Sequence, residues 1–221
     1  MCRMVASPHG IDGSLLIRPF SRMARGMNAL HERNPSRGAY DHPHGWGAVY
    51  AADGKLEAIR GVLPFWADPK VEALAERRVF LLHARRASVG AVTKENTHPF
   101  AEERSGKVVY FCHNGTINDP LIAGYPGETD SLRYFRYLLD RFDERDPEGS
   151  LTDAIQGLGD YIAANAFLLA DDLFCVINRY QKYRRYYTIY RARDVFSSEP
   201  LSEIASDWRP LENGSVICLT C

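Results

Sequence analysis

Hydrophobic residues along the chain fall mostly into short runs bounded by turn residues, a pattern typical of β-strands. The clearest case is a predicted hairpin, in which residues 45–50 and 55–59 flank Asp53-Gly54, a dipeptide that favours tight turns. Further strands are predicted at 79–83, 107–112, 167–170, 173–178, 185–191 and 216–219.

A second periodicity, with apolar residues three and four positions apart, predicts a helix over residues 131–142. Thr129 and Asp130 stand at its start, where a capping hydroxyl and a carboxylate are favoured. Shorter helices are predicted over 150–158 and over 68–78, the latter with Val71, Leu74 and Ala75 on one face. Strands and helices do not alternate regularly, so the pattern indicates an α+β fold with antiparallel sheets.

The composition excludes several classes of partner. The chain has 221 residues, and 27 Lys and Arg against 28 Asp and Glu give a net charge of −1, which argues against nucleic acid or an anionic membrane. No apolar run reaches the roughly 18 residues of a membrane span, and the first residues lack the apolar stretch of a signal peptide. Without a linker rich in Pro, Gly or Ser, we expect one cytoplasmic domain over residues 1–221.

Cysteines and histidines do not form a complete metal or disulfide pattern. Five cysteines, an odd number in a reducing compartment, lead us to expect no disulfide. Cys218 and Cys221 have CxxC spacing without a second pair, and His42 and His44 lack a third ligand, so no metal or cofactor is expected. Segment 179–193 interleaves basic and aromatic residues as single-strand binders do, but a hairpin with arginines in solvent explains it as well.

Cys2 directly follows the initiator Met1, and removal of Met1 would leave a cysteine with a free α-amino group. Such a residue carries a nucleophile and a candidate base together, because the thiol titrates at about 8.5 and the amine at about 7.7–8.0. This is the N-terminal variant of nucleophilic catalysis. A retained Met1 would acylate the amine and block it as a base.

Four further residues suit one kind of substrate. Arg85 follows a predicted strand, where its guanidinium can bind a carboxylate. Asn114 and Gly115 follow another strand in a predicted tight turn, where their N–H groups can stabilise an oxyanion. Asp130 can bind an ammonium group at the start of the helix. Cys2 would attack the side-chain amide of such a substrate, which describes glutamine or a γ-glutamyl compound.

With these residues the chain resembles the class II glutamine amidotransferases, a family of N-terminal-nucleophile hydrolases. The family pattern is a leading Cys, then H-x-R-x-A-[ST]-x-G, N-x-[HQ]-P-[FH], H-N-G-x-I and [ST]-x-[ST]-D. The matching segments here are Cys2, 83–90 (HARRASVG), 96–100 (NTHPF), 113–117 (HNGTI) and 128–130 (ETD). Two further segments, 44–47 (HGWG) and 197–201 (SSEPL), resemble segments typical of stand-alone members, as do Trp208 and Gly214 after them.

The resemblance implies a four-layer αββα sandwich of two antiparallel sheets, of the N-terminal-nucleophile hydrolase type. It implies that Cys2 is the nucleophile and that Asn114 and Gly115 form the oxyanion hole. The substrate-binding residues that it implies are Arg85, Asp130, Ser88, His83 and Trp46. The chain departs from sugar-aminating relatives at Arg86, Val89 and the 42–44 step, so its substrate can differ from plain glutamine.

Two classes of function remain open at this point. The first is an enzyme, either a hydrolase of a γ-glutamyl small molecule or a glutaminase subunit that supplies ammonia to a separate synthetase. The second is a catalytically silent subunit that senses glutamine. The complete set of residues favours the enzyme, and both a synthetase partner and a homo-oligomer are compatible with the sequence.

Overall fold

The computed structural model describes residues 2–221, and Met1 lies outside the described residues. Its strands are β1 (Cys2–Asp12), β2 (Trp46–Ala52), β3 (Lys55–Gly61), β4 (Arg78–Arg85), β5 (Phe100–Arg104), β6 (Lys107–Ile117), β7 (Tyr161–Leu169), β8 (Leu173–Asn178), β9 (Tyr190–Ala192), β10 (Val195–Ser197), β11 (Arg209–Pro210) and β12 (Ser215–Thr220). The first sheet has the order β11-β9-β10-β1-β4-β2-β3, and the second has the order β12-β8-β7-β6-β5. All of these neighbouring strands are antiparallel.

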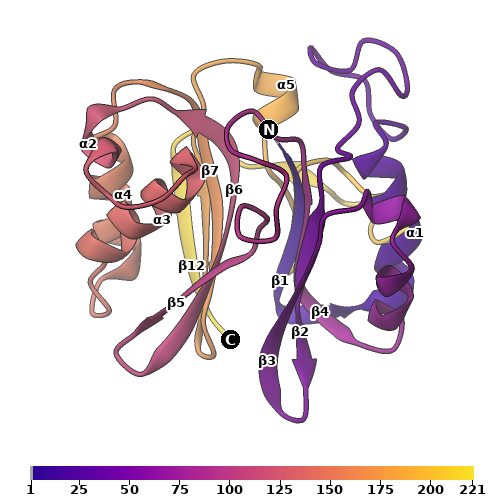
Figure 1. The fold of residues 1–221 in the computed structure, drawn as a ribbon, viewed down its shortest axis with the longest axis horizontal. Coiled ribbons are helices and arrows are strands. Elements are labelled where there is room, and N and C mark those ends of the chain that lie inside the picture. The colour runs from indigo at the N-terminus through magenta and orange to yellow at the C-terminus, as the bar shows by residue number, and fades with distance from the viewer. Residues whose placement is uncertain (1) are drawn as a thin grey trace.

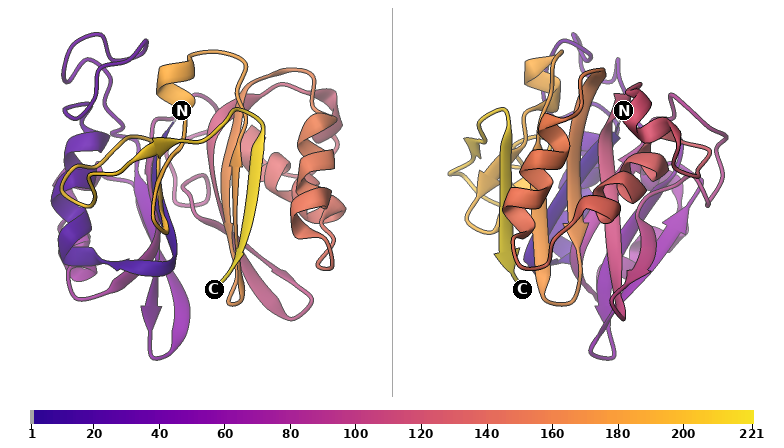
Figure 2. Two further views of the ribbon diagram at one scale, coloured as in Figure 1. Left: turned by 180° about the vertical axis from the view of Figure 1, so that it is seen from behind. Right: turned by 90° about the vertical axis from the view of Figure 1, so that its left-hand side faces the viewer.

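Helices cover the outer face of each sheet, so the fold has four layers (Figures 1 and 2). The first sheet carries α1 (Gly13–Ala24) and two short 3-10 helices, Phe65–Ala67 and Pro69–Leu74. The second sheet carries α2 (Pro120–Ala123), α3 (Asp130–Arg141) and α4 (Pro147–Gln156), while α5 (Arg184–Tyr187) lies near the start of β1. Within residues 2–221, no helix is long and apolar enough to cross a membrane. The predicted α+β fold of two antiparallel sheets is confirmed.

Strand alternation divides the side chains of the first sheet between two cores. Met4 and Leu81 point into the space between the sheets, where they pack with Phe167 of the second sheet. Val5 and Leu82, one residue along each strand, belong instead to the core beneath α1. The parity of a residue along β1 or β4 therefore decides whether it meets the other sheet or the helices.

Two local predictions are confirmed. The hairpin of β2 and β3 turns at Asp53 and Gly54, whose φ angles of 49° and 75° suit a two-residue turn with left-handed backbone. The helix predicted at 131–142 is α3, and the Thr129 hydroxyl caps it by accepting a hydrogen bond from the Leu132 N at 3.2 Å.

Two other local predictions are wrong. Residues 68–78 form only the 3-10 helix Pro69–Leu74, in which Val71 and Leu74, three residues apart, share one face and pack into the core beneath α1. The strand predicted at 185–191 is α5 followed by β9, so segment 179–193 is not a hairpin. Its tyrosines Tyr186 and Tyr187 are nevertheless buried, as the pattern indicated.

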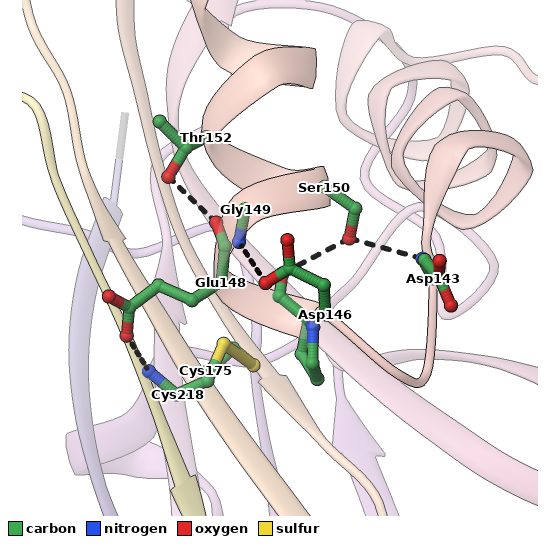
Figure 3. Close-up of a disulfide and its surroundings, with 9 residues drawn as sticks. Asp143, Asp146, Glu148, Gly149, Ser150, Thr152, Cys175 and Cys218 are labelled. Carbon is green, nitrogen blue, oxygen red and sulfur yellow. Dashed lines mark hydrogen bonds between the residues drawn. A yellow bond between two sulfur atoms is a disulfide. The ribbon is translucent and has the colours of Figure 1, made fainter.

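The expectation of no disulfide is also wrong. Cys175 in β8 and Cys218 in β12 are bonded (Figure 3). They occupy directly paired positions of neighbouring strands, with Cα atoms 4.2 Å apart, so the strand register brings them together. Glu148 of α4 accepts a hydrogen bond from the Cys218 N at 3.2 Å beside the disulfide. The CxxC spacing was therefore uninformative, since the partner of Cys218 lies on another strand.

Candidate active site

Strand register gathers three predicted site residues at one end of the first sheet. Cys2, the first residue of β1, lies directly opposite Arg85, the last residue of β4. His83 lies two residues earlier in β4 and so shares the face that looks toward the second sheet. All three side chains are buried, with exposed fractions of 4% for Cys2, 4% for Arg85 and 0% for His83.

Asn114 reaches Cys2 from the second sheet. Its Oδ1 accepts a hydrogen bond from the Cys2 backbone N at 2.7 Å. The Nδ2 group is the donor of the same side chain. Asn114 and Gly115 do not form the predicted tight turn, because β6 continues through them to Ile117 and Gly115 has no left-handed φ. The two candidate oxyanion donors therefore lie in a strand, not in a turn.

The environment of Gly115 explains why this position has no side chain. A Cβ atom there would lie 1.8 Å from the carbonyl oxygen of Ala163. Gly115 pairs with Ala164, whose backbone N donates to the Arg179 carbonyl at 2.8 Å on the other side of β7. Residues paired in this way do not exchange backbone hydrogen bonds, so the Gly115 N–H faces away from β7. Gly115 lines the same cleft as Cys2.

Groups of opposite charge border this cleft. The Arg85 guanidinium donates to the carbonyl oxygens of Val89 and Ala91, both at 3.0 Å, and so anchors the loop that follows β4. Asp130 begins α3, and its Oδ2 accepts a hydrogen bond from the Ile117 N at 2.9 Å. A ligand in the cleft thus meets a cation from the first sheet and an anion from the helix over the second sheet.

The cleft beside Cys2 is narrow. Its lining includes the predicted residues Cys2, Arg85, Ser88, Gly115 and Asp130. These residues come from β1, β4, the loop after β4, β6 and α3, so only the folded chain brings them together.

The surroundings of Cys2 favour the thiolate form of its side chain. Burial raises the pKa of its thiol. The positive charge of the chain's amino terminus at residue 1, the charge and hydrogen bond of His83, and a hydrogen bond from the Arg86 backbone outweigh burial and lower the pKa to about 6. The thiol is therefore mostly ionised at pH 7, which is the reactive form.

Trp46 does not take part in the site, contrary to the expectation. It pairs with Ala84, which places its side chain on the outer face of the first sheet, opposite in direction to His83 and Arg85. There the ring packs against Phe65 at 5.4 Å, and its Nε1 donates to Asp68 at 3.0 Å. Trp46 is a core residue beneath α1.

Two histidines near the site, His98 and His113, have no role in the sequence-based prediction. The His98 ring lies 4.3 Å from the His83 ring, and neither of its nitrogens has a hydrogen-bond partner within residues 2–221. The His113 Nδ1 lies 2.8 Å from the Ser131 hydroxyl, and its Nε2 lies 3.2 Å from the Ala163 carbonyl. Burial lowers the pKa of His98 well below its usual value and that of His113 to about 4, so both rings are neutral at pH 7. In the sequence, the feature that points to these two histidines is their place in the segments 96–100 (NTHPF) and 113–117 (HNGTI).

The described part of the chain, residues 2–221, contains no cluster of side chains that could hold a metal ion. His42 and His44, the pair considered as ligands, are used in hydrogen bonds. The His42 ring bonds the Ala24 carbonyl and the Tyr186 hydroxyl, and the His44 Nδ1 accepts from the Ala87 N at 3.0 Å.

The fold and the site define a two-sheet protein whose cleft is lined by a buried cysteine, an arginine and an aspartate. The model of the class-II glutamine amidotransferases matches residues 28–192, and the chain belongs to this family. The match does not include Cys2, so the evidence on that residue is the geometry above.

Two curated relatives illustrate the sequence likeness. The chain is 35% identical over 117 residues to an uncharacterized protein of Methanocaldococcus jannaschii, which covers 49% of this chain and 33% of that protein. It is 28% identical over 152 residues to YafJ of Escherichia coli K12, which is named as a candidate glutamine amidotransferase, covering 62% of this chain and 54% of YafJ. The chain thus spans about a third to about half the length of these relatives.

Solved structures share the fold. A class-II glutamine amidotransferase domain protein of Silicibacter pomeroyi superposes with a TM-score of 0.60 at 21% identity, covering 99% of this chain and 94% of that one. Glutamine phosphoribosylpyrophosphate amidotransferase of Bacillus subtilis superposes with a TM-score of 0.68 at 14% identity, covering 100% of this chain and 47% of the enzyme. At these identities the likeness concerns the fold alone.

Proposed function

We propose that this protein hydrolyses the γ-amide of glutamine or of a γ-glutamyl compound through a thioester on Cys2. The observation that carries the proposal is one cleft lined by Arg85, Asp130 and a buried cysteine whose pKa is lowered to about 6. Arg85 would bind the α-carboxylate of the substrate and Asp130 its α-ammonium group, which leaves the γ-carbonyl facing Cys2.

The first half of the reaction forms the thioester. After removal of Met1, the α-amino group of Cys2 holds the proton that the thiol has lost, received directly or through a water, and the thiolate attacks the γ-carbonyl carbon. The carbon–nitrogen bond then breaks, and the leaving amine takes the proton from the α-ammonium group. In the second half, water adds to the thioester and releases the γ-carboxylate and the cysteine.

The oxyanion of each tetrahedral intermediate needs donors that are already in place. The Nδ2 group of Asn114 and the backbone N–H of Gly115 suit this role, since the Asn114 Oδ1 is occupied by the Cys2 N and the Gly115 N–H faces away from β7. Donors of this kind typically contribute about 3–4 kcal/mol each to the transition state.

The central experiment compares the unmodified protein with the Cys2→Ala variant. Release of ammonia and glutamate from L-glutamine, and cleavage of a panel of γ-glutamyl amides, are measured together with the intact mass, which reports whether Met1 is present. We expect turnover by the protein that lacks Met1 and none by Cys2→Ala. Cys112→Ala is the matched control, because that buried cysteine is free and does not line the cleft.

Turnover that survives Cys2→Ala would refute the thioester mechanism. Binding of glutamine to the unmodified protein without any turnover would instead support the silent, glutamine-sensing subunit. An electrophilic glutamine analogue gives an independent readout, since a nucleophilic Cys2 should gain the mass of the adduct.

The pH dependence of Cys2 alkylation tests the ionised state. Because the pKa of Cys2 is lowered to about 6, the rate of reaction with iodoacetamide should reach half its plateau near pH 6 and change little above pH 7.5. An ordinary thiol would still gain reactivity between pH 7.5 and 9. Peptide mass spectrometry identifies the alkylated residue, and a midpoint above pH 8 would contradict the proposal.

A further inference from the structure

We propose that Tyr186 is a positioning residue for the nucleophile, and that the buried pair of Arg3 and Glu199 holds Tyr186 in place. The inference rests on the proposed function, in which Cys2 reacts, and it assigns a purpose to the 197–201 segment that the reaction itself does not use.

The backbone of Cys2 has no neighbouring strand on the side that faces β10. In β1, Met4 exchanges hydrogen bonds with Ser198 at 2.8 and 2.9 Å, which shows that even-numbered residues here face β10. Strand β10 pairs with β1 only as far as Val5, so no backbone groups of β10 reach Cys2. Buried backbone groups without a strand partner need side chains to satisfy them.

Two side chains from distant segments supply these partners. The Asn114 Oδ1 accepts from the Cys2 N at 2.7 Å, and the Tyr186 hydroxyl donates to the Cys2 carbonyl oxygen at 3.1 Å. The backbone of Cys2 is thus held at both its N and O atoms. Because the Sγ atom is two bonds from this backbone, its direction toward the cleft depends on both contacts.

Tyr186 is itself fixed by the residue next to Cys2. The Arg3 guanidinium lies 4.1 Å from the centroid of the Tyr186 ring, and its NH1 group donates to the Tyr186 carbonyl at 3.0 Å. Both side chains are fully buried. Arg3 and Cys2 are adjacent in β1, so their side chains point to opposite faces of the sheet. Arg3 therefore contacts Tyr186 from the outer face.

Glu199 keeps the charge of Arg3 compensated. Its carboxylate forms an ion pair with the Arg3 NH2 group, and its second oxygen accepts from the Asn28 Nδ2 at 2.8 Å. Burying an ion pair costs desolvation, and replacing such a pair by apolar residues is often neutral or stabilising. Its presence one residue from the nucleophile fits a geometric purpose better than a contribution to stability.

His42 holds the Tyr186 hydroxyl from the far side. The His42 Nδ1 lies 3.0 Å from the Ala24 carbonyl and its Nε2 lies 3.1 Å from the Tyr186 hydroxyl. Burial keeps the pKa of His42 well below its usual value, so the ring is neutral and carries one proton. That proton belongs on Nδ1, which donates to Ala24, so Nε2 can only accept. The single hydroxyl proton of Tyr186 is therefore shared between the His42 Nε2 and the Cys2 carbonyl.

The neighbouring Tyr187 provides a matched control. It is buried like Tyr186, and the two rings contact each other edge to face with centroids 4.8 Å apart. Its hydroxyl, however, has no hydrogen-bond partner within residues 2–221. Replacing either tyrosine by phenylalanine removes one oxygen from the same buried cluster, but only one of the two changes releases the Cys2 carbonyl.

The experiment therefore compares Tyr186→Phe with Tyr187→Phe. Three readouts are used: kcat and KM with L-glutamine, the pH midpoint of Cys2 alkylation by iodoacetamide, and the Tm. For Tyr186→Phe we expect kcat to fall at least about tenfold with KM within about twofold, and the alkylation midpoint to rise by at least about half a pH unit. Tyr187→Phe should leave all of these values close to those of the unmodified protein.

The positioning role is overturned if Tyr186→Phe is folded and leaves kcat and the alkylation midpoint where Tyr187→Phe leaves them. It is also overturned if both variants lose activity equally, since the effect would then follow from damage to the shared cluster. Alkylation does not depend on glutamine turnover. An unmodified protein that turns over no γ-glutamyl compound would refute the proposed function, while a raised midpoint in Tyr186→Phe alone would still support the positioning role.

Discussion

The two ends of the space between the sheets carry opposite kinds of side chain. At the end where β1 begins, the inner face presents Cys2, His83 and Asn114, and at the other end it presents Leu169, Phe174 and other apolar residues. Figure 1 shows both ends, with the start of β1 near α5 and the hairpins of β2–β3 and β5–β6 at the opposite end.

This difference separates stability from chemistry. The apolar end is stabilised by burial alone, because its side chains need no hydrogen-bond partners. The polar end contains two buried nitrogens without hydrogen-bond partners in residues 2–221, both on His98, and such groups cost free energy. We infer that the apolar end holds the sheets together and so maintains a polar end that would not be stable by itself.

The largest effect is expected from a cavity in the apolar end. Phe174 is fully buried, and its ring lies 5.9 Å from Phe167 and 5.5 Å from Phe196. The Phe174→Ala variant should lose about 3–5 kcal/mol of unfolding free energy in urea denaturation. Its kcat per folded molecule should stay within about twofold at low temperature. A large fall in kcat without loss of stability would show that the two ends are not separable in this way.

The next effect concerns the charge at the polar end. Asp130→Asn keeps the oxygen that accepts from the Ile117 N, so the fold should be retained, but it removes the negative charge from the cleft. We expect KM for L-glutamine to rise about 100-fold, or about 2.7 kcal/mol, with a smaller change in kcat. Asp140→Asn, on the exposed side of the same helix, is the control. Unchanged KM would refute the ammonium-binding role.

The smallest effect tests the outer face of the first sheet. Trp46→Phe removes the hydrogen bond from Nε1 to Asp68, and we expect a loss of about 1–2 kcal/mol of unfolding free energy. Because Trp46 points away from the cleft, KM for L-glutamine should not change. A rise in KM comparable to that of Asp130→Asn would restore Trp46 to the substrate site.

Local rules account for the elements that were predicted well. Asp53-Gly54 adopts positive φ angles whatever surrounds it, and Thr129 caps α3 through a contact three residues away. The first strand and first helix were not predicted. In β1, Arg3 and Ser7 interrupt the apolar pattern, and α1 contains Pro19, yet all three are buried because the tertiary structure provides partners for both faces.

The sequence by itself determined the family, the two-sheet class of fold and the chemical types present in the cleft, because motifs and alternation are local properties of the chain. Only the tertiary structure decided which of those residues meet. Cys2 and Asn114 are 112 residues apart, Cys2 and Tyr186 are 184 apart, and the disulfide spans 43 residues. The disulfide depends directly on the register between its two strands, and a shift of one residue in such a pairing would reverse every face. The same register that brings Cys2 and Arg85 into the cleft turns Trp46 out of it.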